Sequence, residues 1–211
     1  DNIEDMRMEG TLKMREQKYV QAQAIYAQLF EINPNDKRAM IGYAQASFYV
    51  EDYSEAARLY EELLHRHPDN RSIALNLAIS QINSDNAGEG MKQLFRLDYE
   101  NEGDLNVKRA LAWGHLWLKH LDEADALYRE ILMNKACNAS DYLNAGYCNW
   151  FAGRVDMAIT LIKQSVAASG NALKSTDDIM RQFEKDMPLI EKYEVGNIEQ
   201  KMVAELVMEK A

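Results

Sequence analysis

The feature that most constrains this chain is a pattern of small and large residues that returns every 34 residues. In its clearest copy, residues 37–70, one helical stripe carries Met40, Tyr43 and Ala44, and a second carries Ala56, Tyr60 and Leu63. Spacings of three and four residues are typical of helices with one apolar face. Because a single helix pair cannot bury both stripes, the pattern predicts that successive pairs stack on one another.

The same period can be followed at single positions along the chain. The small position of the second helix holds Ala22, Ala56, Gly90, Ala124 and Ala158, and that of the first helix holds Gly10, Ala44, Ala78, Ala112 and Gly146. Small residues opposite large ones let paired helices approach closely. Pro34 and Pro68 close two of the repeats, where each ends one helix before the next begins.

In period, in small and aromatic positions and in the closing proline, these residues resemble the tetratricopeptide repeat family. The resemblance covers five units, residues 3–36, 37–70, 71–104, 105–138 and 139–172. It implies an all-α fold, a right-handed α-α superhelix of helix-turn-helix repeats. The chain departs from the family at several positions. Only Gly153 matches the turn glycine, the closing proline is replaced in the last three units, and Lys108 replaces an apolar residue. The column Lys13, Ser47, Gln81, His115 and Asn149 is polar where the family usually carries a large ring.

The repeat register is lost after Ala172, so residues 173–211 are interpreted separately. Ser175 or Thr176 can cap one helix and Asn197 a last one, with a short turn opened by Pro188 between them. Because a solenoid must cover its last apolar stripe, we expect C-terminal capping helices, in preference to a tail that binds a partner.

Composition and charge narrow the class of protein. The net charge of −10 argues against a nucleic-acid partner, which would require clustered Lys and Arg. No apolar run approaches membrane-spanning length. The compartment stays open with the cytoplasm slightly favoured, because Asp1 is not an initiator Met and a removed leader or anchor would fit that start. One continuous array is favoured over two domains.

Gly90 lies in the middle of the second helix of the third unit. Two interpretations of this glycine are equally favoured: it makes the array flexible there, or it lets the paired helix approach closely.

Nothing in the sequence indicates catalysis or a cofactor. Cys137 and Cys148 are favoured as two core thiols over a disulfide, and neither has metal or redox spacing. The histidines, His65, His67, His115 and His120, offer no metal-ligand geometry with a local carboxylate. No phosphate loop, GxSxG or HExxH motif is present in the sequence. We therefore expect a protein that is not an enzyme and has no catalytic, cofactor or metal residues.

The resemblance implies that the first helices line a concave face, and that function resides there. The outward columns of these helices are unusually apolar. One column, Met14, Phe48, Ile82, Leu116 and Trp150, is interpreted chiefly as core between repeats. The predicted peptide-binding groove is lined by Tyr49, Arg109, Trp113, Trp117, Tyr147, Trp150 and Phe151, with Arg109 as a polar anchor. Rings anchor interfaces well because they lose little side-chain entropy on binding.

The sequence therefore predicts a non-catalytic scaffold that binds a protein or peptide in this groove. The alternative is a regulatory or accessory domain of a larger enzyme or sensor. Self-association through exposed rings is left open. The family's carboxylate clamp is not reproduced, because Ile41, Leu75 and Leu143 stand where its cations would be.

Overall fold

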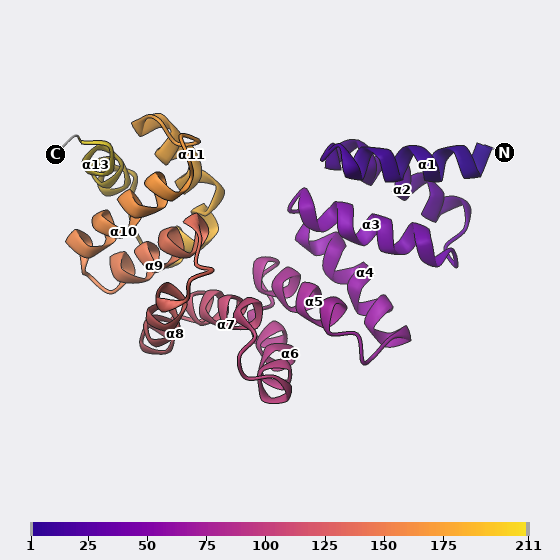
Figure 1. Cartoon of the computed structure of the whole chain (residues 1–211), viewed down its shortest axis with the longest axis horizontal. Coiled ribbons are helices and arrows are strands. Elements are labelled where there is room, and N and C mark those ends of the chain that lie inside the picture. The colour runs from indigo at the N-terminus through magenta and orange to yellow at the C-terminus, as the bar shows by residue number, and fades with distance from the viewer. Residues whose placement is uncertain (1, 210–211) are drawn as a thin grey trace. The chain divides into compact units, whose positions relative to one another are not determined.

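A computed structural model describes residues 2–209 of the chain, and within them it has thirteen helices and no strand (Figure 1). The all-α prediction is confirmed. Ten of the helices form five successive pairs. The pairs are α1 (Asn2–Arg15) and α2 (Tyr19–Ile32), α3 (Lys37–Tyr49) and α4 (Tyr53–Arg66), α5 (Arg71–Asn83) and α6 (Ala87–Glu100), α7 (Leu105–Trp117) and α8 (Leu121–Met133), and α9 (Ala139–Phe151) and α10 (Val155–Ala168).

The 34-residue period reappears in the backbone at both kinds of turn. The first helices from α3 onward begin at a side chain that caps their free amides, namely Asp36, Asn70, Asp104 and Asn138. Each turn within a pair holds one residue of positive φ, namely Gln17, Glu51, Asp85, Lys119 and Gly153. Only the last of these is the glycine that such a conformation favours.

Helices approach closely at glycines, both within a pair and between successive pairs. Tyr26 of α2 lies between two glycines, and a Cβ would come within 2.9 Å of its ring at Gly10 and 2.4 Å at Gly42. At Gly90 an added Cβ would lie 2.7 Å from the carbonyl oxygen of Ala78. Of the two interpretations of Gly90, close helix packing is therefore the one with a structural basis.

The polar column does not face solvent throughout, because some of its side chains contact neighbouring helices or turns. Ser47 is buried and accepts a hydrogen bond of 3.1 Å from Nε2 of Gln23. Near the other end of the chain, Nε of Arg154 donates to Oδ1 of Asn149 at 2.7 Å. Polar side chains thus fill a position where a ring would be usual, and Ser47 and Asn149 have hydrogen-bond partners on neighbouring segments.

The helices form two compact units, residues 2–102 and 103–209. The first unit contains α1 to α6. Its core includes a cluster around Tyr26 and Leu29 and another around Leu59, Tyr60 and Leu63. The boundary between the units falls where the third predicted repeat meets the fourth.

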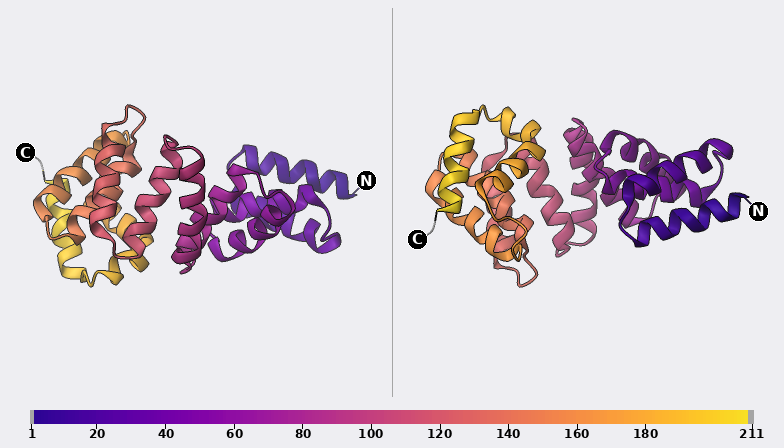
Figure 2. Two further views of the ribbon diagram at one scale, coloured as in Figure 1. Left: turned by 90° about the horizontal axis from the view of Figure 1, so that it is seen from below. Right: turned by 90° about the horizontal axis from the view of Figure 1, so that it is seen from above.

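The second unit contains α7 to α10 and the C-terminal helices α11 (Thr176–Lys185), α12 (Met187–Lys192) and α13 (Asn197–Met208). These three helices pack back on the pairs: α12 contacts α7, and α13 contacts α10 and α11. Figure 2 shows the yellow C-terminal end lying against the orange helices of the same unit. The buried cluster that joins them contains Tyr147, Trp150, Ile162, Ile179, Phe183, Ile190 and Val203. Cys137 and Cys148 in this unit are free thiols, as expected.

Candidate functional site

The seven predicted groove residues divide unequally between the two units. Tyr49 lies at the end of α3 in the first unit, and the other six lie on α7 and α9 in the second. Trp113 and Trp117 are half-buried and meet edge to face, with ring centroids 6.5 Å apart. The six residues are thus brought together on adjacent first helices, but they do not form an open groove.

The space beside these rings is filled by the chain's own C-terminal segment. The ring of Tyr193, just after α12, stacks on Phe151 with centroids 4.1 Å apart and planes 7° from parallel. Its hydroxyl donates a hydrogen bond of 2.6 Å to the carbonyl oxygen of Leu116, and Nζ of Lys192 lies 5.5 Å from the centre of the Trp117 ring. Burial raises the pKa of Tyr193 to about 12. In its position and contacts, this segment takes the place of the predicted peptide.

Two of the predicted site residues are therefore core residues in this structure. Tyr147 is 0% exposed and Trp150 is 3% exposed, both under the C-terminal helices. The Tyr147 hydroxyl donates a 2.5 Å hydrogen bond to Oδ2 of Asp186, between α11 and α12, and burial raises its pKa well above the usual range. The prediction that these two rings contact a partner needs this correction, because large rings on a first helix also suit a face that the chain itself covers.

The predicted polar anchor, Arg109, already has partners within the unit. Its Nε and Nη2 donate to both carboxylate oxygens of buried Asp141, at 2.9 and 2.7 Å. A third hydrogen bond, of 3.0 Å, runs from Nη2 to the carbonyl oxygen of Ala136. Asp141 also completes the capping box of α9, so Arg109 holds the start of the next first helix. Its role is structural, which the sequence could not reveal because the partner lies 32 residues away.

The first unit keeps its first-helix face open at Tyr49, which is 56% exposed. Its ring stacks on Tyr19 of α2, with centroids 4.6 Å apart and planes 17° from parallel. A ring pair of this kind is held in one orientation while much of its surface stays in contact with water. Tyr49 is therefore the one predicted site residue that combines a fixed position with a largely exposed ring.

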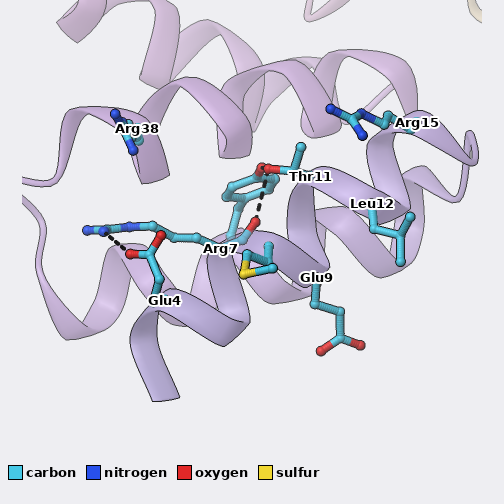
Figure 3. Close-up of a pocket in the computed structure, with 9 residues that line it drawn as sticks. Glu4, Arg7, Glu9, Thr11, Leu12, Arg15 and Arg38 are labelled. Carbon is cyan, nitrogen blue, oxygen red and sulfur yellow. Dashed lines mark hydrogen bonds and ion pairs between the residues drawn. The ribbon is translucent and has the colours of Figure 1, made fainter. Parts of the chain in front are cut away.

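The same unit contains a pocket of about 550 Å³ on α1 (Figure 3). Its walls are Glu4, Arg7, Met8, Glu9, Thr11, Leu12, Arg15, Tyr26 and Arg38. Arg15 occupies the position in α1 that Tyr49 occupies in α3, 34 residues later, so the pocket lies on the outward face of its first helix. Sequence reasoning missed it because Met8 and Leu12 fall outside the columns that indicated the groove.

The rim of the pocket carries three arginines and two glutamates, and within the described part of the chain two of the arginines are not paired with an acid. Arg7 is engaged, with Nη2 2.6 Å from Oδ2 of Asp36 and Nη1 3.2 Å from Glu4. Arg15 and Arg38 form no ion pair among residues 2–209, and Figure 3 shows them on opposite sides of Thr11. The Thr11 hydroxyl donates to the carbonyl oxygen of Arg7 at 3.0 Å. Apolar side chains and the guanidinium groups of Arg15 and Arg38 in one lining suit a ligand that has both apolar and acidic side chains.

No group of three or more His, Cys, Asp or Glu side chains within the described residues could hold a metal ion. The nearest approach of two histidines is at the turn between α7 and α8, where Nδ1 of His115 lies 3.3 Å from Nδ1 of His120. Burial and the neighbouring imidazole of His120 both lower the pKa of His115. From residue 2 to residue 209, the helices are too short or too polar for any of them to span a membrane.

Comparison with known proteins places these features in a class of helical repeat proteins. The family model described as tetratricopeptide repeat matches residues 49–114. No curated protein matches the chain by sequence. A tetratricopeptide repeat protein from Parabacteroides merdae has a similar structure, with a TM-score of 0.68 at 15% identity, over 99% of this chain and 85% of that one.

Two further solved structures share the fold. TTC0263, a thermophilic protein with these repeats from Thermus thermophilus, gives a TM-score of 0.64 at 14% identity, over 85% of this chain and 96% of that one. YrrB, described as having an unusual peptide-binding site, gives 0.54 at 18% identity, over 77% of this chain and 84% of that one. The α-α solenoid fold is thereby confirmed, and the chain resembles tetratricopeptide repeat proteins in fold and, over residues 49–114, in sequence. Proteins of this class are generally non-catalytic interaction scaffolds.

Proposed function

We propose that this chain is a non-catalytic scaffold that binds a peptide segment on the first-helix face of residues 2–102. The observation that carries the proposal is the pocket on α1, which the exposed side chains of Met8 and Leu12 line together with the cations Arg15 and Arg38. Tyr49 lies on the equivalent face of α3 and adds an exposed ring. A surface already fixed by packing loses little entropy on binding, so a few such contacts can suffice for affinity.

The chemistry of the pocket supports a particular kind of peptide. Met8 and Leu12 offer apolar contact, while two guanidinium groups without an ion-pair partner among the described residues favour carboxylates. Glu9 also lines the pocket, but its carboxylate points away from Thr11 in Figure 3. We therefore infer a segment with apolar residues on one side and acidic residues beside them.

The aromatic face of α7 and α9 has a different part in this proposal. Trp117 and Phe151 contact Lys192 and Tyr193, so a partner segment would have to displace α12 to reach them. YrrB, a structural neighbour described as a peptide-binding protein with an unusual site, supports peptide binding as a use of the fold. The peptide is therefore assigned first to the first unit, where Met8 and Tyr49 are already exposed.

A displayed library of random peptides, selected on the whole chain, tests this function. We expect enriched peptides to combine apolar and acidic residues and to lose at least about tenfold in affinity, or about 1.4 kcal/mol, on Leu12→Asp. Met133→Asp is the matched control, because Met133 is 87% exposed on α8 in the other unit. Peptides that bind Leu12→Asp as tightly as the unchanged chain would show that the pocket is not the site.

A further inference from the structure

We propose that the segment bound by the α1 pocket is helix α13 of a second copy of this chain. The inference rests on the proposed function, since it uses the same pocket. Two surfaces of the described chain carry it: an apolar stripe on α13, and the exposed apolar floor beside α1. Each has the chemistry that the other requires.

Helix α13 is apolar on two sides. One side is buried in the second unit through Val203, Ala204 and Val207. The other exposes Ile198, Met202 and Leu206, which are 88%, 43% and 36% exposed. Four-residue spacing places these three on a single stripe that runs along the helix. Such a stripe on a surface helix is the pattern that docks into an apolar groove.

The receiving surface on α1 has the matching spacing. Met8 is 65% exposed and Leu12 is 48% exposed, and the two are four residues apart on one face of the helix. They border the 550 Å³ pocket, whose lining also includes Arg38 at the start of α3, and we expect a side chain of the partner to enter it. Apolar area would thus be removed from water on both sides of the contact.

Charge favours this pairing over contact between two like surfaces. At 100° per residue, Glu205 and Glu199 flank the α13 stripe on opposite sides, whereas the pocket rim carries Arg15 and Arg38. Two copies of α13 brought together would place acid against acid, and two copies of α1 would bring arginines together. The mixed contact brings unlike charges together at Arg15 and Arg38, while Glu9 also lines the pocket, and this attraction lowers the energy of that pairing and raises the rate of encounter.

Because the two surfaces differ, the contact is heterologous. We call the α1 pocket of each copy its head and the α13 stripe its tail. Each head binds one tail, and each tail binds one head. Every added copy leaves a free head and a free tail unless a ring closes. The proposal therefore predicts concentration-dependent growth of the whole chain beyond the monomer.

The test uses two variants of the whole chain that each remove one surface. The head variant is Met8→Asp/Leu12→Asp and the tail variant is Ile198→Asp/Met202→Asp, all at positions at least 43% exposed. Met133→Asp is the control on a surface outside the contact. Circular dichroism first checks that helical content and melting temperature are unchanged, and light scattering after size exclusion then measures mass across concentration.

We expect the unchanged chain and Met133→Asp to gain mass with concentration, and each blocked variant alone to remain monomeric. An equimolar mixture of the two variants should form dimers and nothing larger, because only one intact head and one intact tail remain. The dissociation constant of the dimer should be at least about tenfold lower at low salt than at high salt, because salt screens the attraction between the opposite charges in the contact. The head variant should also fail to bind a synthetic peptide of residues 197–208, which the tail variant should bind.

Three results would overturn the inference: a monomeric unchanged chain at every concentration, self-association of either blocked variant at the unchanged strength, or a mixture that stays monomeric. None of these results would contradict the proposed function, provided that library peptides still bind and that their binding still depends on Leu12. Loss of both the self-contact and all Leu12-dependent peptide binding would remove the pocket as a site altogether.

Discussion

The two units are built from the same helix pair, but they differ in what covers their first helices. In residues 103–209, α11 to α13 cover that face and leave Tyr147 at 0% exposure. In residues 2–102, Tyr49 remains 56% exposed and the pocket on α1 is open. A ring-rich first helix is therefore not by itself a binding surface. Whether it becomes one depends on whether the chain supplies a segment that lies on it.

The chemistry of the two faces agrees with this difference. The face of α7 and α9 gathers Trp113, Trp117, Trp150 and other rings, and an exposed apolar patch of that kind is costly in water. The face of α1 carries Arg7, Thr11 and Arg15, which are compatible with solvent. The covered face belongs to the core of its unit, and the open face is the one that we propose binds a partner. Stability measurements on matched positions can test this division.

The largest expected effect comes from Phe183→Ala. Phe183 is 0% exposed and its ring packs 5.2 Å from Trp150 and 6.1 Å from Tyr147, measured between centroids. Removing it leaves a cavity between the C-terminal helices and the face that they cover, at a cost of about 3–5 kcal/mol. Urea unfolding followed by tryptophan fluorescence measures the loss, since all three tryptophans lie in this unit.

Tyr49→Ala is the matched change on the open face, and it should cost less than about 1 kcal/mol because the ring is already largely in water. Circular dichroism follows it, since the first unit has no tryptophan. Equal losses for the two substitutions would contradict the division into a structural and an open face.

A smaller effect is expected from the glycines that let first and second helices meet. At Gly42 a Cβ would lie 2.4 Å from the ring of Tyr26, which is also confined by Gly10 on its other side. At Gly146 the nearest atom, at 2.8 Å, is Cγ1 of Ile162, on a side chain that can rotate. We expect Gly42→Ala to destabilise by about 1–3 kcal/mol and Gly146→Ala by less.

The control for these glycines is Gly88→Ala in α6, where nothing lies within 4 Å of an added Cβ. Alanine there should be neutral or stabilise by up to about 1 kcal/mol, because glycine is the poorer helix former. Thermal melts of the three variants rank them directly. A melting point for Gly42→Ala at or above that of Gly88→Ala would show that the Tyr26 ring moves freely, against the close packing described here.

The acid stability of the first unit should depend on Asp36. Burial raises the pKa of this carboxyl, but the hydrogen bond from Arg7 and those from the amides of Ala39 and Arg38 outweigh burial and lower it overall. A lowered folded pKa adds stability above the ordinary carboxyl pKa of about 4, and that stability is lost as the pH falls through the folded value. The second unit has two equivalent caps, Asp104 and Asn138, and Asn138 has no charge to lose.

We therefore expect Asp36→Asn to cost about 1 kcal/mol near neutral pH, since asparagine keeps the cap but loses the ionic hydrogen bond. The difference from the unchanged chain should shrink as the pH falls below about 4. Urea unfolding followed by circular dichroism at several pH values measures it. A difference that stays constant down to acid pH would show that the Arg7 contact contributes nothing through charge.

Features that depend on contacts close in the sequence could be predicted from it, and features that depend on distant contacts could not. The helix pairs were predictable because the period repeats local signals, such as the caps Asp36 and Asn138 and the small positions Gly10 and Gly42. The covering of Trp150 was not, because the C-terminal segment has no periodic register that would align it with α9. The α1 pocket depends on Arg38 from the next helix pair, which helical periodicity within α1 cannot reveal.

The smallest effect concerns the turn inside each pair. Glu51 in the first unit and Lys119 in the second occupy the same turn position, with φ of 64° and 61°. A residue with a Cβ is disfavoured there, so Glu51→Gly should stabilise by about 0.5–1 kcal/mol. Lys119→Gly should gain close to nothing, because Nζ of Lys119 lies 5.5 Å from the centre of the Tyr193 ring and that cation–π contact, worth about 0.5–1 kcal/mol, is lost.

The comparison becomes decisive in a Tyr193→Leu background, where Lys119 has no ring to contact. There Lys119→Gly should recover the full gain of Glu51→Gly, because only the backbone conformation then distinguishes the two residues. Urea unfolding of the single and double variants measures the coupling. If Lys119→Gly stabilises equally with and without Tyr193, the lysine does not help to hold the C-terminal segment on α7, and the covered face depends on its apolar contacts alone.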